Sequence, residues 1–126
     1  MTEREFLERT KQFALRIFKL FGALPQTIQR RAVAAQLIRS GTSVAANYRA
    51  ACRARSKPAF VAKLGVVEEE ADESAFWLEL IIETELLSAR KVEPLLAEAG
   101  EIVAMMASSK KTAAKSQIAN RKSAIP

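Results

Sequence analysis

Histidine is absent from the 126 residues, and cysteine occurs once, at Cys52. The missing imidazole removes the commonest general base and the commonest metal-binding side chain. A single cysteine excludes a disulfide within the chain and is typical of proteins in a reducing compartment. Glycine and proline, with four residues each, are too few to supply the turns of a sheet with many strands. These absences point away from a catalytic or disulfide-rich protein and toward a helical one.

Long apolar runs are also missing. No uncharged stretch approaches the roughly 20 residues that span a bilayer. Residues 1–11 carry both charge signs where a signal peptide would have an apolar core. We therefore expect a cytoplasmic protein with no membrane partner. Hydrophobic residues make up 49% of the chain, which is ordinary for a folded domain of this length.

Apolar residues recur every three or four positions in four segments, which predicts four helices and no strands. The first runs from about 4 to 22, and the second from 25 or 27 to about 55. The third follows the N-cap residue Ser56, and the fourth runs from between 89 and 94 to about 115. We expect an all-α, up-down-up-down antiparallel bundle domain over 1–109. A basic extension over 110–126, partly helical or disordered, completes the chain.

Each predicted helix has one continuous apolar face, which we assign to the core. The expected core positions are Phe6, Thr10, Phe13, Ile17 and Leu20, then Ala34, Leu37, Gly41, Val44, Tyr48 and Cys52, and then Phe60, Leu64, Val67, Ala71, Ser74, Leu78 and Ile81. Phe18 widens the first of these faces. Gly41 costs a helix about 1 kcal/mol relative to alanine. It therefore marks either a close approach of a neighbour or a bend.

The third helix carries a second apolar set inside its acidic flank, which a monomeric bundle does not need. Its members are Phe76, Trp77, Leu80 and Leu87. A second apolar face has to be covered, and a partner subunit is the natural cover. The sequence therefore predicts a homo-oligomer with these residues at the interface. Glu85 also falls inside the apolar stripe, near the end of this helix.

Charge is distributed in opposed blocks within a net charge of +6. Residues 28–57 contain seven bases and no acid, whereas residues 58–87 contain eight acids and one base, Lys63. We interpret the two blocks as neighbouring helices whose flanks attract each other. Residues 110–126 contain five further bases and no acid. Contacts from such a cluster to phosphates would be sequence-independent and salt-sensitive.

Bases that pair with the third helix are not free to bind a ligand, and the sequence leaves both possibilities open. The candidate nucleic-acid-binding residues are Arg31, Arg39, Arg49, Arg53, Arg55, Lys110, Lys111, Lys115, Arg121 and Lys122.

No residue pattern indicates catalysis. A di-metal bundle site needs inward carboxylates on several helices and a Glu-x-x-His pair, but here the acids gather on one helix. Residues 68–73 wrap around more than half of that helix and cannot converge on one ion. Cys52 lies on a predicted buried face, where a thiol acts as a small hydrophobe. We expect no enzyme activity, no catalytic residues, no metal, no cofactor and no small-molecule substrate.

Three runs are similar to a known family: RTKQFALRIFKLFGALP (9–25), QLIRSGTSVAANYRAACRARS (36–56) and FVAKLGVVEEEADESAFWLELI (60–81). Over residues 6–107 the chain resembles the four-helix bundle proteins related to the 23S rRNA intervening-sequence protein. The resemblance implies a compact bundle that assembles into a ring-like homopentamer, with no established catalytic residues. It also implies a likeness to accessory proteins of diversity-generating retroelements, which associate with nucleic acid.

The sequence is compatible with two functions. The first is a non-catalytic homo-oligomer that binds RNA or another nucleic acid through basic surfaces. The second is a scaffold for protein–protein interaction, in which the charge serves solubility alone.

Overall fold

The structure is a computed structural model that describes residues 1–22 and 26–124, with side chains described up to residue 116. It contains four helices: α1 (Glu3–Phe21), α2 (Ile28–Cys52), α3 (Lys57–Glu83) and α4 (Ala89–Ala124). No strand occurs in these two ranges. The predicted all-α fold of four helices is confirmed. Proline 25, one of the two expected starts of the second helix, lies outside the described residues.

Side-chain caps fix the starts of three helices, and one of them, Ser56, is the cap that the sequence predicts for the third helix. The Thr2 hydroxyl accepts a hydrogen bond from the Glu5 amide at 3.1 Å, and Thr27 does the same for the amide of Arg30. Ser56 caps α3 by accepting from Ala59 N at 3.2 Å. Each hydroxyl satisfies one amide that would otherwise lack a partner in the first turn of the helix.

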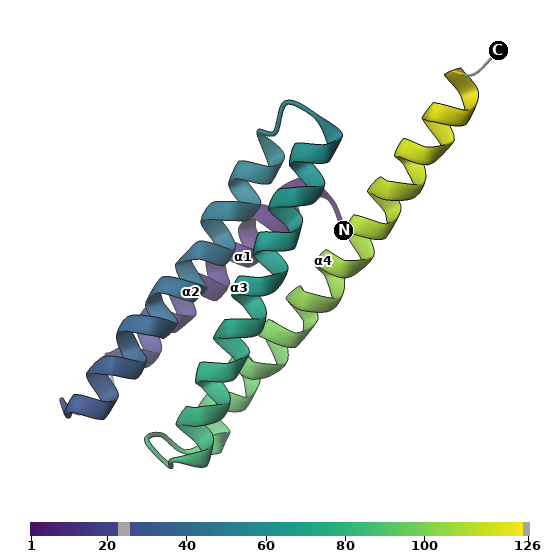
Figure 1. Cartoon of the computed structure of the whole chain (residues 1–126). Coiled ribbons are helices and arrows are strands. Elements are labelled where there is room, and N and C mark those ends of the chain that lie inside the picture. The colour runs from purple at the N-terminus through teal and green to yellow at the C-terminus, as the bar shows by residue number, and fades with distance from the viewer. Residues whose placement is uncertain (23–25, 125–126) are drawn as a thin grey trace.

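The four helices pack against one another in a single bundle. α1 contacts α2 and α4, and α3 contacts the same two helices, so each helix has two neighbours. The connection between α2 and α3 lies at one end of the molecule, and the connection between α3 and α4 lies at the other (Figure 1). The last turns of α4 project past the other helices.

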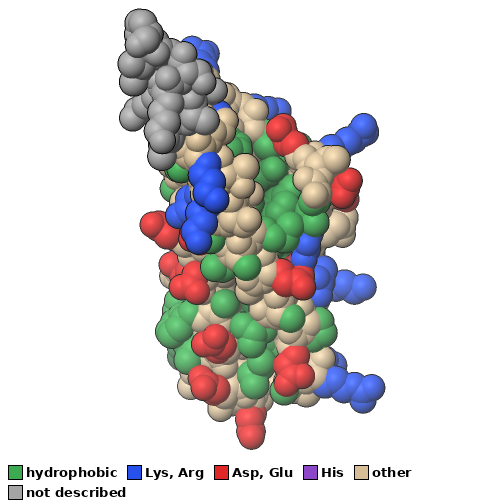
Figure 2. All heavy atoms as spheres, turned by 90° about the vertical axis from the view of Figure 1, so that its right-hand side faces the viewer, with side chains coloured by type: hydrophobic (Ala, Val, Ile, Leu, Met, Phe, Trp, Pro, Cys, Tyr) green, Lys and Arg blue, Asp and Glu red, His purple; other side chains and the backbone are tan. Residues whose placement is uncertain are grey.

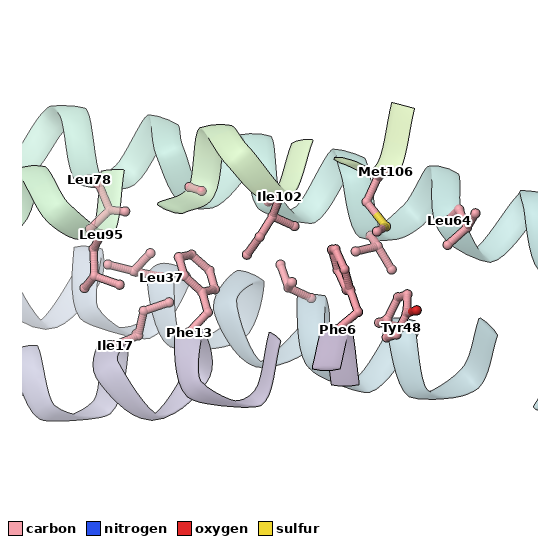
Figure 3. Packing of buried hydrophobic residues seen from close by; sticks show 14 of the residues in the cluster. Phe6, Phe13, Ile17, Leu37, Tyr48, Leu64, Leu78, Leu95, Ile102 and Met106 are labelled. Carbon is pink, nitrogen blue, oxygen red and sulfur yellow. The ribbon is translucent and has the colours of Figure 1, made fainter. Parts of the chain in front are cut away.

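One apolar core fills the space between the helices (Figure 3). Near the α3–α4 connection it contains Ile17, Leu37, Leu78 and Leu95, one from each helix, and all are at most 4% exposed. Toward the other end Phe6, Tyr48, Leu64 and Met106 occupy the corresponding positions. Burying a side chain of this size stabilises the fold by about 1.5–3 kcal/mol.

Small and polar side chains let the helices approach each other in the middle of the core. The Ser40 and Ser74 hydroxyls are fully buried and lie 2.8 Å apart, which joins α2 to α3. Ser74 is among the core positions predicted from the sequence, whereas Ser40 is not. Gly41 is buried against Ile17, whose side chain occupies the space that a Cβ would need. Of the two expected roles for Gly41, the structure supports the close approach.

The end of α3 differs from the prediction. The helix stops at Glu83, and Glu85 adopts a left-handed conformation with φ of 57°. The Glu85 amide donates to the Ile82 carbonyl and the Leu86 amide to the Ile81 carbonyl, both at 3.1 Å. This pair of bonds is the Schellman helix end. Placing Glu85 and Leu87 on the third helix was therefore wrong, because both follow its last turn.

The fourth helix is longer than predicted. It begins at Ala89, within the expected range, and continues to Ala124 instead of ending near residue 115. The extension that begins at residue 110 was expected to be partly helical or disordered, but the alanine and lysine residues in it are good helix formers. Within the described ranges, none of the four helices has a stretch long and apolar enough to cross a membrane.

Candidate nucleic-acid interface

Basic side chains from segments far apart in sequence meet at the end of the molecule that carries the α2–α3 connection. We call this set the basic end. It comprises Arg4, Arg49, Arg53, Arg55, Lys57, Lys110, Lys111 and Lys115. Six of these eight residues are among the predicted candidates. The two that sequence reasoning missed, Arg4 and Lys57, open α1 and α3.

Contacts between neighbouring helices place these residues together. Arg4 of α1 and Arg49 of α2 border the same groove. Lys57 Nζ donates to Ser116 Oγ, which brings the start of α3 against the later turns of α4. A hydroxyl-rich depression lies between these two helices, lined by Lys57, Phe60, Ser108, Ser109, Thr112, Ala113 and Ser116. Lysine, arginine and hydroxyl groups are the side chains that most often contact nucleic-acid backbones.

Most bases of this end are free to bind an anion. All except Lys110 are exposed in the described chain. Lys110 pairs with Glu68 at 2.9 Å. In the side chains described, no acid lies within 4.0 Å of the charged groups of Arg49, Arg53 or Arg55. The acids near these bases are Glu68 of α3, which pairs with Lys110, and Glu3, Glu5 and Glu8 in the early turns of α1.

The remaining candidates lie elsewhere or outside the described side chains. Arg39 is bound to two acids of α3, Glu70 at 3.1 Å and Glu73. The attraction predicted between the opposed charge blocks is thus present, but Arg39 is the base of α2 that makes it. Arg31 is exposed in the first turn of α2, toward the opposite end of the bundle. Helix α4 includes Arg121 and Lys122, whose side chains lie outside the described set.

The surface that α4 presents supports this division of charge (Figure 2). Acidic side chains dominate the lower half of that face, whereas Lys and Arg side chains lie along one edge and in the upper half, with acids among them. The charge pattern is therefore graded along the molecule and does not form a uniformly basic face.

Tyr48 and Cys52 are structural neighbours near the basic end. Tyr48 is 7% exposed and packs on Phe6 with ring centroids 4.7 Å apart, as predicted for a core residue. Burial raises the pKa of both Tyr48 and Cys52, and the carboxylate of Glu3 raises that of the thiol further. Both groups are therefore neutral near pH 7. Across the described side chains, no cluster of three metal-ligating residues occurs.

Three of the four interface candidates lie together on the outer side of α3. Phe76 is 50% exposed and meets the half-buried Trp77 edge to face, with centroids 5.1 Å apart. Leu80 is half-buried and borders a groove with Arg30 at the start of α2. Leu87 does not share this surface, because it follows α3 and faces Lys19, Leu20 and Lys91 between α1 and α4.

A second exposed apolar surface lies on α1, and sequence reasoning missed it. Leu15 is 49% exposed and Phe18 is 53% exposed. Phe18 was expected to widen the buried stripe of the first helix, and that expectation was wrong. The spacing of α1 residues shows the stripe but does not reveal how much of it the neighbouring helices cover.

Comparison with known proteins identifies relatives. The model of the family described as "23S rRNA-intervening sequence protein" matches residues 2–108. A crystal structure of a protein of unknown function from the S23 ribosomal protein family of Bacteroides thetaiotaomicron is 33% identical, with a TM-score of 0.79. The similarity covers 88% of this chain and 99% of that chain. No match is found among curated proteins.

Proposed function

The chain belongs to the 23S rRNA-intervening sequence protein family, and on that premise we propose that it is a non-catalytic homo-oligomer that binds RNA through the basic end. The predicted family relationship is confirmed. The family is named for an intervening sequence of ribosomal RNA, which suggests structured RNA as the ligand.

The observation that carries the proposal is the convergence of free bases at one end. Arg53 and Arg55 lie in the α2–α3 connection, Lys57 opens α3, and Lys111 and Lys115 come from α4. A polyanion is the ligand that such a cluster attracts most strongly. Because lysine and arginine would contact phosphates, binding should depend on salt far more than on base sequence.

Assembly would strengthen this binding. We extend the proposal to an up-down-up-down bundle that forms a ring-like homo-oligomer, a pentamer as the resemblance implies. The exposed Phe18 of α1 and Phe76 of α3 support a subunit contact, since both would be covered in an assembly. A ring repeats the basic end once per subunit, so several weak contacts to one RNA would add up through effective concentration.

Catalysis is not part of the proposal. The sequence has no histidine, and the Cys52 thiol has a raised pKa, which disfavours the reactive thiolate. RNA would therefore be bound and not processed. The cytoplasm is the compartment in which the protein would meet it.

The test compares two triple variants that remove equal charge. One is Arg53→Ala, Arg55→Ala and Lys57→Ala at the basic end, and the other is Lys19→Ala, Arg31→Ala and Arg90→Ala, three exposed bases away from it. Binding to a structured RNA is measured at several salt concentrations. The first variant should weaken binding and flatten the slope of log K against log salt by about 0.7–0.9 per lost phosphate contact. The second should leave both nearly unchanged.

Equal weakening by the two triple variants would show that binding follows net charge, and the basic end would lose its assignment. Undetectable RNA binding by the unaltered protein at low salt would remove the RNA proposal altogether.

The competing function is a protein-interaction scaffold, which the exposed Leu15, Phe18 and Phe76 favour. Pull-downs from nuclease-treated extract separate the two functions. A specific protein retained after RNA is destroyed supports the scaffold, whereas loss of all partners with the RNA supports RNA binding.

A further inference from the structure

A groove with an apolar floor runs between α1 and α2 on the outside of the bundle. Leu7 and Ala14 form its α1 wall, and Thr42, Ala45 and Ala46 form its α2 wall. Its volume is about 600 Å³. The short side chains of Thr42, Ala45 and Ala46 leave this space open on the α2 side. Covering apolar surface of this kind with a large side chain is favourable, because it removes that surface from water.

The rim of the same groove is mainly basic. Arg4 and Lys11 border it from α1 and Arg49 from α2, with Glu8 as the one acid among its lining residues. The exposed Leu15 directly follows Ala14 on α1, and the exposed Phe18 lies about one turn beyond Ala14. The groove is therefore matched to an acidic helix that carries a large apolar residue.

The outer stripe of α3 has this composition. Its exposed residues recur at helical spacing and are Glu69, Asp72, Phe76, Glu79 and Glu83. Phe76 stands half exposed at the centre of this stripe, with acids on both sides along the helix. We call these five residues the acidic ridge. A phenylalanine kept in water among carboxylates is unexplained within a single chain.

The groove and the ridge cannot meet within one chain, because α1 and α3 are not neighbours in the bundle. We propose that the acidic ridge of one copy docks in the α1–α2 groove of the next copy, with Phe76 on the alanine floor and the carboxylates facing Arg4, Lys11 and Arg49. This inference rests on the homo-oligomer proposed above and names its contact. At 1.5 Å per residue, the ridge and the α1 side from Arg4 to Phe18 each span about 21 Å.

Such a contact joins two different surfaces, and contacts of this type close into rings or extend into filaments. It also separates the roles of the bases. Arg4 and Arg49 would face the neighbouring subunit, which leaves Arg53, Arg55, Lys57, Lys111 and Lys115 for RNA.

Two single variants test the contact from its two sides. Phe76→Glu removes the ridge's apolar residue, and Ala46→Arg fills the groove at a position that is exposed in the single chain. Each variant alone should shift the mass measured by light scattering from multimer to monomer. Mixed together they should form a one-to-one dimer and nothing larger, because the intact groove of Phe76→Glu accepts the intact ridge of Ala46→Arg.

Matched controls are Ile28→Glu, at an apolar residue 76% exposed, and Ala97→Arg, at an exposed alanine of α4. Both should keep the wild-type mass, and circular dichroism of all four variants should match that of the unaltered protein.

The possible results separate the contact from the assembly. If the unaltered protein is multimeric and Ala46→Arg keeps its mass, the groove is not the interface, although the oligomer stands. Failure of the two variants to form a mixed dimer would mean that ridge and groove do not bind each other. A protein that is monomeric at all concentrations overturns both the contact and the oligomer, and an acidic helix of another protein then becomes the occupant to seek.

Discussion

Arg9 and Arg39 make the same kind of contact on opposite sides of the bundle. Arg9 of α1 reaches Glu98 and Glu101 of α4, and Arg39 of α2 reaches Glu70 and Glu73 of α3. In each case two acids three residues apart share one face of the neighbouring helix. The two clusters nevertheless differ in geometry and in burial, and therefore in what they contribute.

Arg9 binds one carboxylate with two parallel hydrogen bonds. Its Nε donates to Glu98 Oε2 at 2.8 Å and its Nη2 to Glu98 Oε1 at 2.6 Å. The side chains are 25% and 14% exposed. Arg39 instead divides its donors between two carboxylates, and its side chain is 48% exposed. Paired hydrogen bonds between a shielded guanidinium and a carboxylate are stronger than single exposed ones.

The packing around each cluster explains why this matters. α2 and α3 pack closely and share the buried Ser40–Ser74 contact. α1 and α4 are the least closely packed of the four neighbouring pairs. The ion pair of Arg9 therefore joins the neighbouring helices that approach each other least closely, whereas Arg39 joins two helices that already pack tightly against each other. We expect the two arginines to differ in their contribution to stability.

The largest expected effect is from Arg9→Ala. It leaves the Glu98 carboxylate, 14% exposed, without its charged donor, and should lower the free energy of unfolding by about 2 kcal/mol. Urea denaturation followed by circular dichroism measures this. The free energy of unfolding of Arg9→Lys should lie between those of wild type and Arg9→Ala, because lysine keeps the charge but cannot make the paired hydrogen bonds. A loss no greater than that of Arg39→Ala would refute the distinction drawn between the clusters.

The second prediction concerns pH and the same ion pair. The hydrogen bond from Arg9 holds the pKa of Glu98 below its usual value, although partial burial acts in the opposite direction. A depressed folded-state pKa contributes stability that is complete above the unfolded pKa, about 4.3. That contribution is lost as the pH falls through the lower, folded value. The stability difference between wild type and Arg9→Ala should therefore narrow below about pH 4.

Urea denaturation of both proteins at several pH values between 7 and 3 gives this difference directly. The other titrating groups are the same in the two proteins, so their contributions to the stability difference largely cancel. Curves that stay parallel to the lowest pH would show that Glu98 does not respond to Arg9.

The helices and most of the core could be predicted because their signals are local. Helix starts are marked by residues whose hydroxyl can cap a helix, which are Thr2, Thr27 and Ser56. The apolar spacing identifies buried residues such as Phe13 and Leu64. Helix ends were harder to place. The sequence around Glu85 has no glycine to mark the left-handed residue that ends α3, so the pattern appeared to continue to Leu87.

The candidate site depends on contacts between helices, which spacing along one helix does not reveal. Arg9 and Glu98 are 89 residues apart, and neither stood out in the sequence. Arg39 and Arg53 belong to the same basic block, yet Arg39 faces α3 and Arg53 follows the end of α2. Local sequence identified the basic block but could not separate its paired residues from its free ones.

Arg39→Ala is expected to have the smaller effect of the two arginine substitutions. Exposed ion pairs typically contribute about 0.2–1 kcal/mol, and neither Glu70 nor Glu73 becomes a buried unpaired charge when Arg39 is removed, since solvent reaches both. Urea denaturation at low salt should show a loss within that range. A loss near 2 kcal/mol, as expected for Arg9, would mean that the α2–α3 seam depends on its charges after all.

The smallest effect expected is the response of the two clusters to salt, and it isolates burial as the cause of their difference. At about 1 M salt the screening length falls to about 3 Å, so the contribution of the exposed Arg39 should vanish. The guanidinium of Arg9 and the carboxylate of Glu98 are in direct contact and partly shielded from solvent, so most of their contribution should remain. Comparing Arg9→Ala and Arg39→Ala with wild type at low and high salt tests this. If high salt removes both differences equally, shielding from solvent is not what distinguishes the two seams.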